Sequence, residues 1–219
     1  MKLLIAVPTM DNVPVEFLKS LVGLIEDLQT EGVDYEVLIE NGTLIYMARD
    51  RLASVAILGN YTHVLWLDSD MVFEPSLLED LSFSGKPFVT GIAHARRAPF
   101  NSCLFKDIHL DTLTRWRAKD YPSETFEVAG CGFACVLMEA DILRDVQKVY
   151  DTCFTPFPKY GEDLSFCKRA TALGYKLYAE PTVRLGHVGR YAIYPEEEEK
   201  YLGTAISNIE ELRRKNIGN

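Results

Sequence analysis

The sequence lacks a long apolar run and lacks any excess of positive charge. No segment reaches the roughly 18 consecutive apolar residues that cross a bilayer, so we expect no membrane span and no processive polysaccharide synthase. Lys and Arg number 23 against 32 Asp and Glu, a formal net charge of −9. Generic nucleic-acid binding needs dense Lys and Arg and is not expected. A small anionic ligand held by one metal ion and a few local groups is compatible with this charge.

Cysteine is scarce and follows no metal-site or disulfide pattern. The five cysteines are Cys103, Cys131, Cys135, Cys153 and Cys167. The apolar stretch Leu3–Val7 stops at Pro8 and is shorter than a secretory core of roughly 7–15 residues. An odd, scattered set of cysteines without such a segment predicts reduced thiols and a cytoplasmic location. Cys131 and Cys135 have no second Cys/His pair at zinc spacing, so we expect buried structural thiols.

Internal repeats, low-complexity tracts and Pro/Gly/Ser-rich linkers are also absent. The hydrophobic fraction of 47% and the charged fraction of 25% are typical of a globular chain. A chain of 219 residues buries enough surface to fold without disulfides or structural metals. We therefore expect one domain over residues 1–219.

The first half alternates between short apolar runs and segments with a helical period. The expected strands are Lys2–Val7, Tyr35–Ile39, His63–Leu67 and Phe88–Ile92, and the expected helices begin at Val15, Leu44 and Pro75. This alternation predicts an α/β fold with a mostly parallel central sheet flanked by helices. Ligands of such sheets bind beyond the carboxyl ends of the strands. Thr9, Glu40, Asp68 and Asp70 fall at those ends, as a nucleotide site requires.

The second half is less regular. We expect an irregular stretch with a short helix over Ala93–Tyr121, strands at Phe126–Val128, Phe133–Met138, Lys176–Ala179 and Thr182–Val188, helices at Ala140–Val149 and Glu162–Gly174, a loop over Asp151–Tyr160, and a last amphipathic helix from about Glu196 to Lys215. Basic residues gather at His94, Arg96, Arg97, Lys106 and His109. They form either a solvated loop or a flap that closes over a diphosphate or an anionic acceptor.

The strongest chemical signal is Asp68-Ser69-Asp70, directly after an apolar strand. Such a triplet is common by chance and often caps a helix. Its position after the third strand of a βαβ series favours a metal site instead. Mg²⁺ and Mn²⁺ in nucleotide sites are typically held by one or two carboxylates plus diphosphate oxygens.

Two further motifs have both a structural and a functional interpretation. Glu162 and Asp163 follow Gly161 at a helix start, where they either cap the helix or provide a general base for an acceptor hydroxyl. His187 stands between two glycines after an apolar strand. It is either a structural histidine or a ligand of a Mn²⁺-like ion.

Together, these motifs resemble those of GT-A fold glycosyltransferases. The resemblance rests on Pro8-Thr9, Asp68-Ser69-Asp70, Glu162-Asp163 and Gly186-His187, in this order along the chain. More narrowly, it points to bacterial and phage-type enzymes near the inverting family-2 group, in which Asn41-Gly42-Thr43 and Ala48-Arg49-Asp50 also have counterparts. It covers Lys2 to about Gly189 and implies a single GT-A domain. Residues 1–92 would form the nucleotide-binding half, residues 93–190 the acceptor and metal half, and residues 191–219 a C-terminal helix.

The resemblance also implies roles for individual residues. Donor-binding residues would be Pro8 and Thr9 at the base, Glu40 near uracil and ribose, Arg49 at the uracil edge or the diphosphate, Asp68 and Ser69 beside the ribose, and Gly130 and Gly132 beneath the sugar. Asp70, His187 and Asp68 would form the metal site, Asp163 the general base, and Glu162 the acceptor side. Where these enzymes usually have Asp-Asp-Gly-Ser, this chain has Glu40-Asn41-Gly42-Thr43. The identity of the donor's nucleobase is therefore left open. Both assignments have a purely structural alternative. Arg49 would form a surface salt bridge on its helix, and Gly130-Cys131-Gly132 would form a tight turn between strands.

With this resemblance, the sequence predicts a glycosyltransferase that moves a hexose from a UDP-sugar to a hydroxyl acceptor and depends on Mn²⁺ or Mg²⁺. An inverting mechanism with Asp163 as base is what the resemblance implies. The class of acceptor is open. A nucleotidyltransferase is a weaker alternative, because residues 9–14 lack the Gly-rich basic loop of that class. A nucleotide-sugar hydrolase would show the same motifs. A binding module without turnover would lack a base or a metal ligand, whereas Asp70, Asp163 and His187 are all present.

Overall fold

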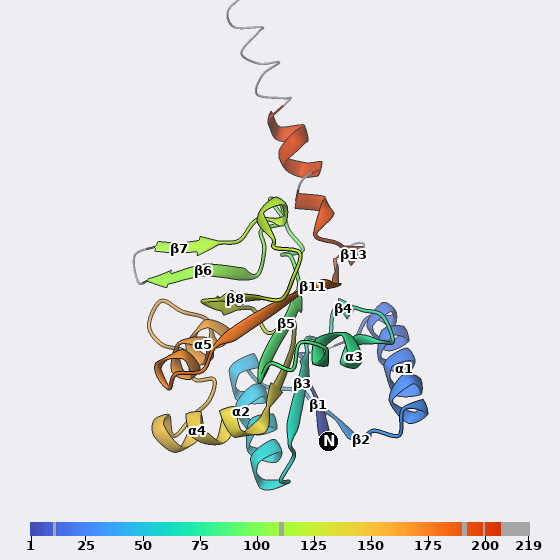
Figure 1. Ribbon diagram of the computed structural model, residues 1–219, viewed down its shortest axis with the longest axis vertical. Helices are drawn as coiled ribbons and strands as arrows, with labels where there is room; N and C mark the ends of the chain where they lie inside the picture. The colour runs from blue at the N-terminus through green and yellow to red at the C-terminus, as the bar shows by residue number, and fades with distance from the viewer. Residues whose placement is uncertain (11, 110–111, 190–191, 199, 207–219) are drawn as a thin grey trace, which may run out of the picture.

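The computed structural model describes residues 1–10, 12–109, 112–189, 192–198 and 200–206. At its centre is a seven-stranded sheet in the order β2-β1-β3-β10-β5-β11-β8 (Figure 1). Its strands are β1 (Lys2–Pro8), β2 (Asp34–Glu40), β3 (His63–Leu67), β5 (Phe88–Ile92), β8 (Phe126–Val128), β10 (Cys135–Glu139) and β11 (Leu177–Arg184). β1, β2, β3, β5 and β11 run in one direction, while β10 and β8 are antiparallel to their neighbours. The expected mostly parallel sheet is confirmed.

Helices cover both faces of this sheet. They are α1 (Val15–Thr30), α2 (Ile45–Leu58), α3 (Leu77–Ser82), α4 (Ala140–Tyr150) and α5 (Glu162–Ala172). Side chains alternate along β1, so Leu3, Ile5 and Val7 pack in one core cluster with α1 and α3. Leu4 and Ala6 pack in the other cluster with α2, α4 and α5. A strand buried on both faces reads as a continuous apolar run, which is why the sequence identifies these strands.

A small three-stranded sheet brings distant segments together beside the central sheet. β4 (Met71–Val72) follows β3 at once, and β12 (Gly186–Val188) pairs with it antiparallel. β13 (Ala192–Ile193) completes this sheet. The sequence predicted one strand over Thr182–Val188. Instead β11 continues through Pro181 with a register shift between Ala179 and Arg184, and β12 is separate. A bulge accommodates a proline that cannot donate to the ladder.

The segment Ala93–Tyr121 is more regular than the sequence predicted. It holds a hairpin of β6 (Leu104–His109) and β7 (Thr112–Arg115), and β6 also pairs with β9 (Gly130–Cys131). The expected short helix is the 3₁₀ turn η1 (Ala118–Asp120). The prediction of an irregular stretch was wrong because β6 mixes buried Leu104, Phe105 and Ile108 with charged residues without a regular alternation, and β7 is exposed along its whole length.

Smaller differences affect boundaries. β10 begins two residues later than the predicted Phe133–Met138 strand, and α3 begins at Leu77, not at Pro75. Residues 196–198 and 200–206 are helical, and the remainder of the predicted last helix, residues 207–215, lies outside the described residues. All five cysteines are free, and four of them are buried. Within the described ranges, no helix has the length and apolar character needed to cross a membrane.

Candidate active site

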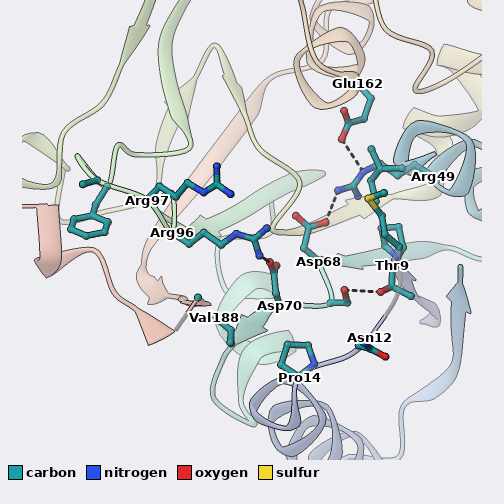
Figure 2. A pocket seen from close by; sticks show the side chains of 17 residues that line it. Thr9, Asn12, Pro14, Arg49, Asp68, Asp70, Arg96, Arg97, Glu162 and Val188 are labelled. Carbon is teal, nitrogen blue, oxygen red and sulfur yellow. Dashed lines mark hydrogen bonds and ion pairs between the residues drawn. The ribbon is translucent and has the colours of Figure 1, made fainter. Parts of the chain in front are cut away.

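A cavity of about 1170 Å³ opens at the carboxyl ends of β1 and β3 (Figure 2). Most residues that the motifs pointed to line it: Pro8, Thr9, Arg49, Asp68, Ser69, Asp70 and Glu162. They come from the ends of two neighbouring parallel strands, from α2 and from the start of α5. The topology therefore gathers them at the sheet edge where α/β proteins bind ligands.

Arg49 is a buried bridge between two carboxylates of the cavity. Its side chain is 2% exposed, and its Nη2 donates to Asp68 Oδ1 at 2.6 Å. Its Nε lies 3.6 Å from Glu162 Oε1. The guanidinium carbon lies 5.2 Å from the centre of the Phe133 ring, a distance that permits a cation–π contact. A surface salt bridge is excluded, and Arg49 instead links the Asp68 turn to the start of α5.

Burial raises the pKa of Asp68, although the Arg49 charge opposes this shift. Arg49 Nη1 is buried, and no described residue offers it a hydrogen-bond acceptor. A buried donor without a partner is costly, so this corner of the cavity favours a ligand that brings an acceptor oxygen. The diphosphate role predicted for Arg49 is compatible with this geometry.

The β1 end forms a second polar corner. Ser69 Oγ donates to Thr9 Oγ1 at 3.0 Å, which ties the β1 and β3 ends together. The Thr9 amide donates to the Glu40 carbonyl at 2.9 Å. The Glu40 carboxylate accepts from Arg51 at 2.6 Å and is not among the side chains lining the cavity. Thr9 thus faces the cavity, whereas the Glu40 side chain is engaged elsewhere.

Asp70 and His187 meet because β12 pairs with β4. His187 is opposite Met71 in the register, and the Val188 amide donates to the Asp70 carbonyl at 2.8 Å. His187 Nε2 lies 3.2 Å from Asp70 Oδ2, and its Nδ1 donates to the His94 carbonyl at 2.8 Å. Burial lowers the pKa of His187, but the hydrogen bond and charge of Asp70 outweigh it and raise the pKa.

Asp70 has a third partner that the sequence did not predict. Arg96 Nη1 donates to Asp70 Oδ2 at 2.6 Å, from a loop that follows β5 (Figure 2). Burial alone would raise the pKa of Asp70, but the hydrogen bond and charge of His187 and the charge of Arg96 lower it. The sequence does not predict the contact between Arg96 and Asp70. The two residues are far apart in the chain, and only the fold of the loop after β5 brings them together.

Asp70 and His187 could supply only part of the shell of a hard divalent cation, so water or ligand oxygens would supply the rest. Within the described part of the chain, no group of three or more His, Cys, Asp or Glu side chains could hold a metal ion by itself. Asp70 and His187 supply one oxygen and one nitrogen, and the His94 carbonyl fixes the ring so that Nε2 faces Asp70. That backbone contact is typical of metal-binding histidines. Mg²⁺ and Mn²⁺ commonly take one or two protein ligands and complete their shell with phosphate oxygens and water.

Asp163 lies at the start of α5 in a close-fitting backbone environment. Its Oδ1 accepts from the Leu164 amide at 2.6 Å, so it does contribute to capping. A Cβ at Gly161 would lie 2.8 Å from Oδ1, and one at Gly132 would lie 3.7 Å from Oδ2. Burial and the neighbouring charge of Glu162 raise the pKa of Asp163 to about 6. A carboxylate with a pKa near neutrality is suited to proton transfer.

Gly130 and Gly132 differ in position. A Cβ at Gly130 would lie 2.5 Å from Ile108 Cδ1, inside the core under the β6 strand. Gly132 stands between Cys103 and Asp163. Gly132 is therefore the one next to predicted catalytic machinery, and Gly130 is required for packing.

No protein-family model matches the chain. Among curated proteins, the mannan polymerase complex subunit MNN9 of Candida albicans is 27% identical over 204 residues, which cover 75% of this chain and 54% of that protein. The chain therefore spans about half the length of this relative.

Solved structures with the same fold include A197 and GalNAc-T7. The protein A197 from STIV has a TM-score of 0.56 and 19% identity, and the match covers 90% of this chain and 92% of the other. GalNAc-T7, crystallised with UDP, GalNAc and Mn²⁺, has a TM-score of 0.56 and 11% identity, and the match covers 87% of this chain and 44% of the other. At these identities the likeness is one of fold. The predicted GT-A resemblance and fold class are confirmed.

Proposed function

We propose that the protein is a glycosyltransferase that moves a hexose from a UDP-sugar to a hydroxyl acceptor, with inversion and with Mn²⁺ or Mg²⁺ as cofactor. The observation that carries the proposal is the geometry around one cavity. Asp70 and Glu162 line this cavity with the Asp68–Arg49 ion pair. His187, which contacts Asp70, and Asp163, which follows Glu162 and has a pKa of about 6, stand behind these two lining residues in contact or in sequence. The GT-A structure of GalNAc-T7 contains UDP and Mn²⁺, which supports the choice of donor and cation.

The charge of the cavity supports the need for a cation. Its lining contains three arginines and three carboxylates: Arg49, Arg96, Arg97, Asp68, Asp70 and Glu162. The formal charge of these side chains is therefore zero. A nucleoside diphosphate brings additional negative charge into this partly enclosed space, where uncompensated charge is costly. A divalent cation at Asp70 and His187 would supply the compensating charge.

The donor would lie along the β1 and β3 ends. Pro8 and Thr9 would contact the base, Asp68 and Ser69 the ribose, Arg49 a diphosphate oxygen, and Gly132 the sugar. Glu40 would act through its backbone, since its carboxylate is held by Arg51. Residues 1–92 would thus supply the nucleotide side and residues 93–190 the acceptor side and the histidine.

The chain's own groups would perform the proton chemistry. Asp70 and His187 would hold the cation, which when bound stabilises the negative charge of the leaving diphosphate as a Lewis acid. Asp163 would accept the proton of the acceptor hydroxyl as that oxygen attacks the anomeric carbon. Glu162 would help to orient the acceptor, and Arg49 would keep Glu162 and Asp68 in register.

Three alternatives keep the same cavity. A nucleotidyltransferase fits less well, because residues 9–14 offer no glycine-rich basic loop. A nucleotide-sugar hydrolase would use water in place of the acceptor. A binding module would not need the raised pKa of Asp163, which favours an active base.

The five free thiols are consistent with the reducing environment of a cytoplasm. We therefore include a cytoplasmic location in the proposal.

The test is a transfer assay with a panel of nucleotide-sugars and hydroxyl acceptors, with Mn²⁺ or with EDTA. We expect release of UDP and a glycosylated product that depend on Mn²⁺, and a loss of about 10²–10⁴-fold in Asp163→Asn. UDP release at the same rate without any acceptor would indicate a hydrolase. Full activity in EDTA would contradict the cation's role.

A further inference from the structure

Asp70 Oδ2 is shared by two donors from different parts of the chain. Arg96 Nη1 lies 2.6 Å from this oxygen and His187 Nε2 lies 3.2 Å from it. A cation held by Asp70 and His187 would replace the contact between these two side chains, and the Arg96 guanidinium beside Asp70 Oδ2 would repel it. The guanidinium and the cation therefore compete for the same carboxylate.

The loop that carries Arg96 has a fixed base. The His94 ring is fully buried and is held through Nδ1 by the Phe100 carbonyl at 2.7 Å and through Nε2 by the Tyr121 hydroxyl at 2.8 Å. The Ala95 amide donates to the Asn101 carbonyl at 2.8 Å, so the loop closes as a short hairpin. The His94 carbonyl also accepts from His187. Since the loop base is tied to the histidine, Arg96 can change partner by a movement of its side chain alone.

A second arginine on this loop faces the cavity. Arg97 points into it from the side opposite Arg49 (Figure 2). Both Arg96 and Arg97 are exposed, and Arg96 is 49% exposed, so neither pays a large desolvation cost to move. Guanidinium groups bind phosphate oxygens in a bidentate manner.

We propose that Arg96 is an exchangeable counter-ion: it holds Asp70 in the ligand-free protein, leaves it when a divalent cation binds, and then joins Arg97 on the diphosphate of the donor. This inference rests on the proposed function, because it assumes a donor diphosphate in the cavity. It gives the Arg96–Arg97 pair a defined partner, the anionic leaving group. It also couples the two ligands: the cation releases the residue that the donor requires.

The test is a titration of the donor-free protein with Mn²⁺, in which electron paramagnetic resonance measures the concentration of unbound Mn²⁺. Arg97→Ala is the matched control for Arg96→Ala, because it removes the same charge from the same loop without a contact to Asp70. We expect Arg96→Ala to bind Mn²⁺ about fivefold more tightly than Arg97→Ala. With Mn²⁺ saturating, calorimetric titration of UDP should show about fivefold or greater weakening in both variants.

The possible outcomes separate this inference from the function on which it rests. Equal Mn²⁺ affinities in the two variants would overturn the competition at Asp70. UDP affinity unchanged in Arg96→Ala would overturn its transfer to the diphosphate. If neither the wild type nor the variants bind Mn²⁺ or UDP, the proposed function itself fails.

Discussion

At the scale of single residues, burial and neighbouring charge decide what each carboxylate of the cavity can do. Asp163 and Asp70 are both acidic side chains at element ends, yet their pKa values move in opposite directions. Burial beside Glu162 keeps a proton on Asp163 up to about pH 6. The cationic partners of Asp70 keep it ionised and suited to hold positive charge. This difference supports the proposed roles of Asp163 as base and Asp70 as cation ligand.

The pKa of Asp163 predicts the pH dependence of transfer. The base must be ionised to accept a proton, so kcat/KM should rise with pH through about 6 and level off above it. Initial rates measured between pH 5 and 8 with saturating Mn²⁺ would test this. In the Asp163→Asn variant, the residual kcat/KM should no longer rise with pH near 6. A rise that persists in that variant would assign the titration to another group.

The same shift predicts that Asp163 costs stability. Between its ordinary pKa of 3.8 and about 6, the folded protein retains a proton that the unfolded chain has lost, so stability falls as pH rises through this window. Asp163→Asn removes the cost and should stabilise the protein by up to about 3 kcal/mol above pH 6. Urea denaturation of both proteins at pH 7.5 and pH 4 would measure the difference. The stability difference between the two proteins should shrink towards zero at pH 4. An equal difference at pH 7.5 and pH 4 would show that the ionisation of Asp163 is not its cause.

Some of these residues could be identified from the sequence and others could not. Asp68, Asp70 and Asp163 follow an apolar strand or open a helix, so their positions are readable from local pattern. Arg96 was identified only as one of a group of basic residues, and its contact with Asp70 was not predicted, because that contact depends on how a loop folds back over the sheet edge. The Arg49 bridge was also missed, since burial of a helix arginine depends on the aromatic side chains that three other segments place around it.

At the scale of elements, the pairing of β12 with β4 is what makes a cation site possible. β4 follows Asp70 without a loop, and antiparallel pairing places His187 opposite Met71. Both strands are two or three residues long. Strands this short carry no periodic signal, so the sequence could suggest His187 only through its neighbouring glycines.

This pairing predicts the effect of a substitution that touches no ligand. A Cβ at Gly186 would lie 2.9 Å from Tyr194 Cζ and 3.1 Å from Val72 Cβ. Gly186→Val should therefore push β12 away from β4 and weaken Mn²⁺ binding by about tenfold or more, with a destabilisation of about 1–3 kcal/mol.

The matched control is Gly203→Val, where a Cβ would meet no heavy atom within 4 Å. Mn²⁺ titrations below the melting temperature of each variant would separate affinity from stability. Wild-type affinity in Gly186→Val would show that His187 does not depend on this pairing.

At the scale of the whole molecule, most of the central sheet was predictable because its strands are buried on both faces. Continuous apolar runs and helical periods gave β1, β3 and β5 and the helices between them. The place of β10 between β3 and β5 was not predictable, because strand order is set by pairing between segments far apart in sequence. The hairpin of β6 and β7 was missed because β6 has no regular alternation of apolar and polar residues and β7 is exposed throughout.

The whole fold also determines which parts must act together. Asp70 comes from residues 1–92, while His187 and Asp163 come from residues 93–190, on strands and a helix that pack on one sheet. The proposed cation-dependent binding of a nucleotide-sugar would therefore require both parts of the domain at once. Neither part alone presents the cavity.

The decisive measurement is calorimetric titration of UDP into the protein with Mn²⁺ and with EDTA, with GDP, CDP and ADP as competitors for the choice of base. We expect UDP to bind with Mn²⁺ and to lose most of its affinity in EDTA, and Asp70→Ala to bind as the wild type does in EDTA. Binding of no diphosphate under any condition, or equal binding with and without Mn²⁺, would contradict a cation-dependent glycosyltransferase.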